Sequence, residues 1–381
     1  MKKTKRILQI SIGTTVFGGV EQMIYQIYKN IDREKIQFDL LSPNLTTYGI
    51  HEDEILKMGG KIIELKADRS NLKGKLKYYV RLYKFLKKNS YEIVHINSGA
   101  FLFVLMVSII CRLAGIKKII VHSHNARQGL NLGKRVVFDL LKPILALVAT
   151  DYMACSELAG RSMFNKRLFK QNKVIIIKNG IDIQKYKFNL EIRNKYRMKL
   201  GIDENIVYGH VGRFELQKNH EFLIDIFFHI QKIQPEAVLL LIGDGELKEK
   251  IIRKLEGLKI KDKVKFLGVR KDVPELLQAI DCFILPSLYE GLPVVGVEAQ
   301  ASGVPLFCSD SITEELRLLD TTKYISLNTE ANEWAKLICK SIDNKDCRIR
   351  EEAYKIVEEK GYDIKKTAEQ LENIYLGEEV D

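Results

Sequence analysis

The sequence of 381 residues lacks the features that mark several classes of protein. Its six cysteines lie far apart without a C-x-x-C pair, which excludes a disulfide scaffold and is typical of a reduced cytosolic protein. No apolar run reaches the roughly 20 residues that cross a bilayer, and the uncharged run Ala100–Cys111 fits a helix covering a sheet better. The short apolar run near the N-terminus is not followed by a signal-peptide cleavage site. We therefore predict a cytoplasmic protein.

Two phosphate-binding motifs are also missing. The first predicted loop does not read G-x-G-x-x-G, and G-x-x-x-x-G-K-[ST] does not occur, so neither a dinucleotide-binding motif nor a P-loop is present. Repeats and low-complexity tracts are absent as well. What the sequence does contain is an ordinary globular composition, 46% hydrophobic and 29% charged, over a length typical of two domains.

Short β-branched runs alternate with longer amphipathic stretches along the whole chain. Such runs, without polar alternation, are typical of strands buried on both faces of a parallel sheet. They are Arg6–Ile12, Phe38–Ser42, Lys61–Lys66, Glu92–Asn97, Lys118–His122, Asp151–Cys155 and Val174–Lys178, and then Ile206–Gly212, Ala237–Gly243, Val264–Leu267, Cys282–Pro286, Val304–Cys308 and Tyr324–Leu327. We predict two doubly wound α/β domains, residues 1–185 and 186–363, followed by a helix with a frayed tail at 364–381.

Charge is distributed unevenly between the two halves. Residues 1–185 hold 32 Lys and Arg against 14 Asp and Glu, a net charge of +18, whereas the remainder carries −6. A basic half suggests an anionic partner, either nucleic acid or an anionic membrane surface. Within it, Asn71–Asn89 reads as a basic helix with Leu76, Tyr79, Val80, Tyr83 and Leu86 on one stripe. That stripe fits either membrane binding or ordinary packing on the sheet.

The segment Leu288–Ser302 is the most specific signal in the sequence. It follows the predicted strand Cys282–Pro286, so its loop lies at the carboxyl end of a sheet, where open α/β sheets bind ligands. Gly291 allows close approach to the backbone, and the start of the helix that follows forms an anion site. Glu290 and Glu298 lie eight residues apart, about 12 Å if the segment is helical. The pair suits hydroxyl groups at opposite ends of an extended sugar nucleotide.

A second cluster of polar residues follows the strand Ile206–Gly212. Arg213 and Lys218 leave the sheet edge together, and Asn219 is a candidate cap for the next helix. A guanidinium and an ammonium at one point suit a diphosphate, and solvated surface charge is the alternative interpretation.

Two weaker signals lie in the first domain. The loop Gly13–Glu21 contains Gly18 and Gly19, which fit either close approach to a phosphate or a plain tight turn. Strand alternation places His122 and His124 on one face of the sheet, either at a reacting sugar or as two core imidazoles. No third ligand lies nearby, so we predict no metal site.

These four motifs, in this order, closely resemble those of glycosyltransferase family 4. The motifs are Gly-Gly-Val-Glu at 18–21, His-Ser-His at 122–124, Gly-Arg…Lys-Asn at 212–219 and Glu-Gly-Leu-Pro…Glu at 290–298. The resemblance covers about residues 5–375. It implies the GT-B fold, with two Rossmann-like domains facing across a cleft and a C-terminal helix that crosses back to the first, and retaining transfer of a sugar from a nucleotide sugar.

The resemblance also implies a role for each site residue. Arg213 and Lys218 would hold the donor diphosphate. Glu290 would contact hydroxyls of the donor sugar and Glu298 the ribose, while His124 would lie near the transferred sugar. The remaining donor-binding groups would be backbone amides of Gly18, Gly19, Gly291 and Leu292.

The predicted function is metal-independent hexosyl transfer, without a cofactor, to a lipid-linked glycan in capsule or exopolysaccharide biosynthesis. The sequence contains no D-x-D triplet, so Arg213, Lys218 and a helix N-terminus would stabilise the departing diphosphate. Uridine is the expected base, and peripheral binding to the inner face of the membrane is expected from the basic domain. Alternatives are a nucleotide-sugar epimerase, a phosphorylase, or a non-enzymatic nucleic-acid binder, for which neither a recognition helix nor aromatic platforms are evident.

Overall fold

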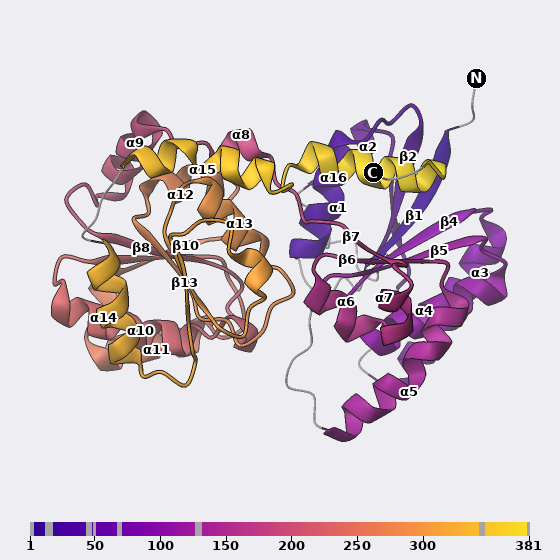
Figure 1. The fold of residues 1–381 in the computed structure, drawn as a ribbon, viewed down its shortest axis with the longest axis horizontal. Helices are drawn as coiled ribbons and strands as arrows, with labels where there is room; N and C mark the ends of the chain where they lie inside the picture. Colours follow the sequence, from indigo (N-terminus) through magenta and orange to yellow (C-terminus); the bar gives the residue numbers. More distant parts are fainter. Residues whose placement is uncertain are drawn as a thin grey trace. The chain divides into compact units, whose positions relative to one another are not determined.

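The computed structural model describes residues 4–11, 18–42, 48, 51–66, 71–125, 132–342 and 347–378. The chain divides into two units, the first formed by Met1–Gly180 with Ile364–Asp381 and the second by Ile181–Asp363 (Figure 1). Both units consist of a parallel sheet with helices, as predicted. The second unit begins a few residues before the boundary expected at residue 186.

The first unit is built on a seven-stranded parallel sheet with the order β3-β2-β1-β4-β5-β6-β7. The strands are β1 (Lys5–Ser11), β2 (Ile36–Ser42), β3 (Lys61–Glu64), β4 (Ile93–Asn97), β5 (Lys118–Ser123), β6 (Asp151–Ala154) and β7 (Val174–Ile176). The helices are α1 (Gly19–Asn30), α2 (Glu52–Lys57), α3 (Leu72–Lys88), α4 (Phe101–Ala114), α5 (Leu132–Val148), α6 (Glu157–Met163), α7 (Lys166–Lys170) and α16 (Ile364–Leu376).

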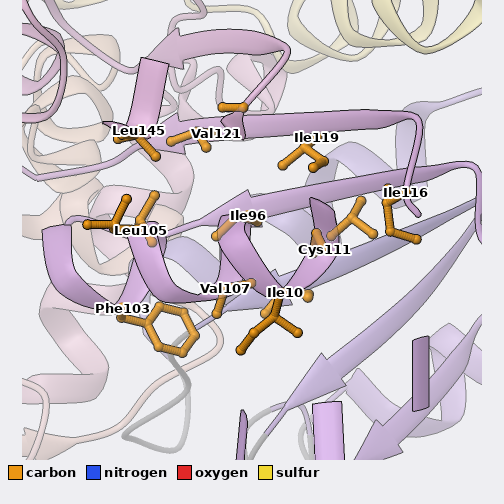
Figure 2. Packing of buried hydrophobic residues seen from close by; sticks show 14 of the residues in the cluster. Ile10, Ile96, Phe103, Leu105, Val107, Cys111, Ile116, Ile119, Val121 and Leu145 are labelled. Atoms are coloured by element: carbon orange, nitrogen blue, oxygen red, sulfur yellow. The ribbon is translucent and has the colours of Figure 1, made fainter. Parts of the chain in front are cut away.

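The apolar run expected to cover a sheet does so as α4. Its buried side chains, Phe103 and Val107 among them, pack on strand residues such as Ile10 and Ile96 (Figure 2). Among the described residues, no helix is both long enough and apolar enough to cross a membrane. The five cysteines whose side chains are described are all buried.

The last helix of the chain, α16, belongs to the first unit. Ile364, Ala368, Leu371, Ile374 and Tyr375 are buried in one apolar cluster with residues of α1 and the sheet. The predicted return of the C-terminal helix to the first domain is therefore confirmed.

The second unit is built on a six-stranded parallel sheet with the order β10-β9-β8-β11-β12-β13. Its strands are β8 (Val207–Val211), β9 (Val238–Ile242), β10 (Val264–Gly268), β11 (Cys282–Leu285), β12 (Leu306–Ser309) and β13 (Thr322–Ile325). Its helices are α8 (Ile183–Tyr186), α9 (Leu190–Leu200), α10 (His220–Ile233), α11 (Lys248–Leu258), α12 (Val273–Ala279), α13 (Val294–Ala301), α14 (Ala331–Ile342) and α15 (Cys347–Glu359).

Each sheet reverses its strand order once, next to the first strand of its unit. In the first sheet β1 lies between β2 and β4, and in the second β8 lies between β9 and β11. Loops leave the carboxyl ends of these paired strands in opposite directions, which opens a crevice where such sheets bind ligands. The two reversal points are therefore where binding residues are expected.

Helix α3 presents a different face to the sheet from the one predicted. Its buried residues are Tyr78, Leu82 and Leu86, spaced one helical turn apart. Leu76 and Val80 of the predicted stripe are exposed. Two apolar stripes therefore run along this helix. The prediction is wrong for Leu86, which belongs to the buried stripe, whereas Leu76, Val80 and Tyr83 form the exposed one.

Candidate active site

The reversal point of the second sheet brings together the two strongest motifs. Strands β8 and β11 are neighbours, with Cys282 paired to Tyr208. The loop after β8 carries Arg213 and Lys218, and the loop after β11 carries Glu290. Because parallel strands end at the same edge of a sheet, residues 72 positions apart in the sequence, such as Lys218 and Glu290, can form one site.

Glycines hold the loop after β8 against the neighbouring turn. Gly243 adopts a φ of +134°, and a Cβ there would lie 2.1 Å from the carbonyl oxygen of Gly212. The amide of Phe214 donates to the carbonyl of Asp244 at 3.0 Å. Contact this close requires glycine and fixes the course of the chain from Gly212 to the site residues that follow.

Lys218 and Glu290 form the centre of the site. Lys218 Nζ lies 2.6 Å from Glu290 Oε1, with 18% and 9% of the two side chains exposed. Gln217 Nε2 donates to the other carboxylate oxygen of Glu290 at 2.9 Å and to the carbonyl of Tyr289 at 3.0 Å. An ammonium has three N–H donors, so Lys218 can hold Glu290 and a ligand oxygen together. The carboxylate keeps further lone pairs for ligand hydroxyls.

Arg213 lies in the loop where it was predicted, whereas Asn219 does not make the predicted helix cap. Arg213 leaves the same loop as Lys218, and its guanidinium pairs with Glu215 at 2.6 Å while 40% of the side chain stays exposed. Asn219 precedes α10 in a left-handed conformation with a φ of 54° and makes no side-chain cap. Its amide instead donates to the carbonyl of Pro286, 3.1 Å away at the end of β11. The predicted capping role is wrong, because this side chain ties the two loops of the site together.

Glu290 and Glu298 do not lie along one helix. Helix α13 begins at Val294, so Glu290 lies in the loop before it and the helical rise does not set their separation. Glu298 accepts a hydrogen bond of 2.6 Å from the hydroxyl of Tyr186. Burial raises the pKa of Glu298, and the Tyr186 hydrogen bond acts against this shift. Burial, and then the charge of Glu298, raises the pKa of Tyr186 well above its usual range, so this phenol stays a donor.

The other donor-binding residues proposed for this unit lie between the two glutamates. Gly291 and Leu292 are buried in the loop that leads to the N-terminus of α13. The first amides of a helix have no partners within it and carry the positive end of the helix dipole. This arrangement suits an anionic oxygen beside Glu290.

Residues predicted for the first unit lie at the carboxyl end of its sheet. The imidazoles of His122 and His124 lie with their centroids 4.0 Å apart and their planes tilted by 39°, so the prediction of a shared face is confirmed. Burial lowers the pKa of His124 to about 3, so its ring is neutral. Gly18 is the residue before α1, in an extended conformation, and Gly19 is the first residue of that helix. The rest of the predicted Gly-Gly loop, residues 13–17, lies outside the described residues.

Sequence reasoning missed several contacts of these residues. Gln217 directly precedes Lys218 in the sequence, so its contact with Glu290 could have been predicted from that position. Tyr186 is 112 positions from Glu298, and no local pattern links the two. The same holds for Asn97 of β4, the hydrogen-bond partner of His124, 27 positions before it in the sequence.

Comparison with known proteins agrees with this arrangement. Residues 17–185 match the family described as Glycosyltransferase Family 4, and residues 192–362 match Glycosyl transferases group 1. The chain is 32% identical over 377 residues to the protein named EpsF in Bacillus subtilis, itself assigned as a glycosyltransferase, covering 97% of this chain and 96% of that protein.

A second relative is named as an Escherichia coli enzyme, UDP-Gal:alpha-D-GlcNAc-diphosphoundecaprenol alpha-1,3-galactosyltransferase. It is 26% identical over 382 residues, covering 95% of this chain and 94% of the enzyme. Among solved structures, Alr3699/HepE of Anabaena in complex with UDP-glucose has a similar fold, with a TM-score of 0.78 at 20% identity over 98% of this chain and 99% of that chain. The chain is therefore a glycosyltransferase of the GT-B fold and belongs to glycosyltransferase family 4.

Proposed function

We propose that this enzyme transfers a sugar from a UDP-sugar to a lipid-linked glycan during assembly of a capsule or exopolysaccharide. The observation that carries the proposal is the contact of Lys218 with Glu290 at the reversal point of the second sheet. A cation and a carboxylate side by side match the diphosphate and the hydroxyl groups of a donor sugar. The Escherichia coli relative is named for a UDP-galactose donor and a diphosphoundecaprenol-linked acceptor, which supports both substrate classes.

Each site residue binds a different part of the donor. Arg213 and Lys218 hold the diphosphate, assisted by the amides of Gly291 and Leu292 before α13. Glu290 accepts hydrogen bonds from the sugar, and Glu298 accepts them from the ribose. In the first unit, His124 contacts the transferred sugar, and Gly18 and Gly19 contribute backbone amides.

The chemical step requires a stabilised leaving group. Cleavage of the glycosyl–phosphate bond leaves negative charge on the diphosphate, and cations already in place stabilise that charge without reorganisation. Arg213, Lys218 and the N-terminus of α13 supply this positive charge, so we expect no requirement for a divalent ion or a cofactor. The acceptor hydroxyl attacks from the face that the diphosphate leaves, the phosphate takes its proton, and configuration is retained.

A panel of nucleotide sugars tests the proposed donor. We expect one UDP-sugar to raise the melting temperature and to be hydrolysed slowly without acceptor, in buffer containing a chelator. An NMR spectrum of the donor after incubation without acceptor separates this reaction from the epimerase alternative, which would yield a second nucleotide sugar. Transfer to a lipid-linked glycan in the same buffer completes the test, and an absolute requirement for added Mg²⁺ or Mn²⁺ would contradict it.

The basic first unit provides the surface for a lipid-linked acceptor. Helices α3, α4 and α5 lie side by side (Figure 1). Helix α3 carries seven Lys and Arg and no acidic residue. All three carry apolar side chains that are at least a third exposed: Leu72, Leu76, Val80 and Tyr83 on α3, Leu102, Met106 and Leu113 on α4, and Val136, Val137, Leu140, Ile144 and Leu147 on α5. We call these twelve residues the exposed apolar face.

Spacing and charge together favour an anionic bilayer as the partner of this face. On α5, Val136, Leu140, Ile144 and Leu147 recur every three or four residues, so they line one side of the helix. A surface depression of about 450 Å³ beside α3 is lined by Lys66, Arg81 and Lys84 together with Glu64 and Leu65. Apolar side chains flanked by cations bind at the boundary between headgroups and acyl chains. We therefore propose peripheral attachment to the cytoplasmic face of the cell membrane.

Vesicle cosedimentation tests this attachment. We expect binding to vesicles with anionic lipid at low salt, weaker binding at high salt, and reduced binding of Leu140→Ser. Leu337→Ser is the matched control, because Leu337 is a half-exposed leucine on α14 of the other unit. The proposal would be contradicted by equal binding to anionic and neutral vesicles. It would also be contradicted by an equal loss of binding in Leu140→Ser and Leu337→Ser.

A further inference from the structure

A chain of buried polar side chains connects the C-terminal helix to His124. Tyr375 of α16 accepts a hydrogen bond of 3.0 Å from Gln9 Nε2 on β1. Gln9 Oε1 in turn accepts one of 2.8 Å from Asn97 Nδ2 on β4, and Asn97 Oδ1 lies 3.1 Å from His124 Nε2. Gln9, Asn97 and Tyr375 are each 1% exposed, so water does not compete for these bonds. At the far end, the Tyr375 hydroxyl also contacts His95 Nδ1 at 2.6 Å.

One of the contacts that set the direction of this chain is made by Asn97. Its Nδ2 also faces the backbone carbonyl of His95 at 3.3 Å, and a carbonyl can only accept. If the amide turned over, Asn97 Oδ1 would face that carbonyl and lose the bond. With Nδ2 on this side, Oδ1 faces His124 and can only accept, so Nε2 of His124 must donate.

The tautomer of His124 follows from this direction. Burial lowers the pKa of its imidazole to about 3, so the ring carries one N–H at neutral pH. That proton is on Nε2, bonded to Asn97, and Nδ1 keeps its lone pair. The ring can then accept a hydrogen bond from a substrate hydroxyl through Nδ1 and cannot donate one there.

We propose that Asn97, Gln9 and Tyr375 are positioning residues that hold His124 as the Nε2–H tautomer, with Nδ1 as the acceptor for a sugar hydroxyl. The role of the hydroxyl rests on the proposed function, whereas the tautomer does not. Tyr375 contributes because its oxygen is the acceptor for Gln9 Nε2. Without it, the two orientations of the Gln9 amide become similar in energy, and the orientation of Asn97 is less strongly imposed. Tyr375 of α16, more than 250 residues along the chain from His124, thereby influences the proton position at the sheet edge.

Nitrogen-15 NMR of the histidine side chains reads the tautomer directly, without substrate. Protonated and unprotonated ring nitrogens differ in chemical shift, and the His124 signals are identified by their loss in His124→Gln. We expect a single Nε2–H tautomer in the wild type and a mixture in Asn97→Leu and Tyr375→Phe. Asn97→Asp keeps an acceptor oxygen for Nε2–H, so we expect it to restore the proton to Nε2.

Tyr28→Phe is the matched control for Tyr375→Phe. Both tyrosines are buried in the same apolar cluster and pack on Phe38, with ring centroids 5.1 Å and 5.8 Å away, but the Tyr28 hydroxyl bonds to Gln37 and the carbonyl of Met58. A merely structural role predicts equal loss of melting temperature in the two variants and an unchanged His124 tautomer in both.

Each outcome decides the proposal. His124 signals that match the wild type in Asn97→Leu and Tyr375→Phe overturn it, and a shift in Asn97→Leu alone overturns the role assigned to Tyr375. In the transfer assay we expect Tyr375→Phe to lower kcat/KM about tenfold, as for one lost hydrogen bond, with Tyr28→Phe unchanged. If the wild type transfers no sugar, the proposed function fails while the tautomer result stands.

Discussion

At the scale of single residues, the ion pair of Lys218 and Glu290 lies where we propose that the donor sugar joins its diphosphate. The pair is largely buried, and Gln217 bonds to the carboxylate oxygen that Lys218 leaves open. Loss of one partner from a buried pair leaves an uncompensated charge. Variants of this pair therefore need a stability measurement beside each activity measurement.

Glu298 gives a prediction of its own, because the hydroxyl of Tyr186 donates a hydrogen bond to its carboxylate. We expect Tyr186→Phe to raise the donor KM about tenfold with kcat little changed, since a ribose contact holds the donor equally before and during reaction. Donor saturation curves measure this change. Tyr196→Phe is the control, because Tyr196 also bonds to a carboxylate, that of Asp272 at 3.0 Å, outside the proposed site. Equal donor KM values in the wild type and Tyr186→Phe would show that Tyr186 does not contribute to donor binding.

At the scale of elements, the strands were predictable and the faces of the helices were not. Every predicted strand is present, with ends within about two residues, because continuous β-branched runs fit only strands buried on both sides. Helix α3 shows the limit of this reasoning. It carries two apolar stripes, and only contact with the sheet decides that Tyr78, Leu82 and Leu86 pack while Leu76 and Val80 stay exposed.

The loop after β8 depends on one glycine of the neighbouring turn. A Cβ at Gly243 would meet the carbonyl of Gly212, and the φ of +134° is strained for other residues. We expect Gly243→Ala to lower the free energy of unfolding by roughly 2–4 kcal/mol and to impair transfer, because the loop of Lys218 must move. Gly257→Ala in α11 is the control, since a Cβ there meets nothing within 4 Å.

Urea unfolding of Gly243→Ala and Gly257→Ala separates the effect of the close loop contact from the general effect of replacing glycine by alanine. Alanine replaces glycine favourably inside a helix, so we expect Gly257→Ala to gain about 0.5–1 kcal/mol and keep wild-type activity. If Gly243→Ala matched the wild type in stability and activity, the close contact of the two loops would be ruled out.

At the scale of the whole molecule, buried histidines make stability sensitive to acid. Burial lowers the pKa of His95 to about 3, that of His210 to about 4 and that of His220 to about 2. The unfolded chain takes up these protons below about pH 6.5, and the folded chain does not until the pH reaches the lowered pKa. The free energy of unfolding should therefore fall as the pH drops below 6.5, by on the order of 2 kcal/mol per histidine at pH 5.

Denaturant unfolding between pH 7.5 and 5 measures this slope. Among the described residues, neither ring nitrogen of His220 has a hydrogen-bond partner, and the ring stacks on Phe214 at 4.3 Å. We expect His220→Phe to keep the stability of the wild type near pH 7.5 and to reduce the loss at pH 5. A pH slope identical to that of the wild type would show that His220 takes up its proton in the folded state as readily as in the unfolded chain.

How much of the site was predictable depends on distance along the chain. Lys218 and Glu290 were found because each follows a strand of the same sheet, and parallel topology brings such residues to one edge. Tyr186 and Tyr375 reach Glu298 and Gln9 from positions over 100 residues away, and no periodicity encodes those contacts. The structure brings Lys218 and Glu290 together, and the substrate-binding roles of these two residues, like those of Arg213, Glu298 and His124, remain predictions.

Sugar transfer by Lys218→Met tests the central claim most directly, which is that the cation at the end of β8 stabilises the departing diphosphate. Lys232→Met, an exposed lysine at the other end of α10, is the control. We predict a loss of roughly 10²–10³ in kcat, about 3–4 kcal/mol in the barrier, for Lys218→Met and none for Lys232→Met, with both variants folded at the assay temperature. A folded Lys218→Met enzyme that transfers sugar at the wild-type rate would contradict the account.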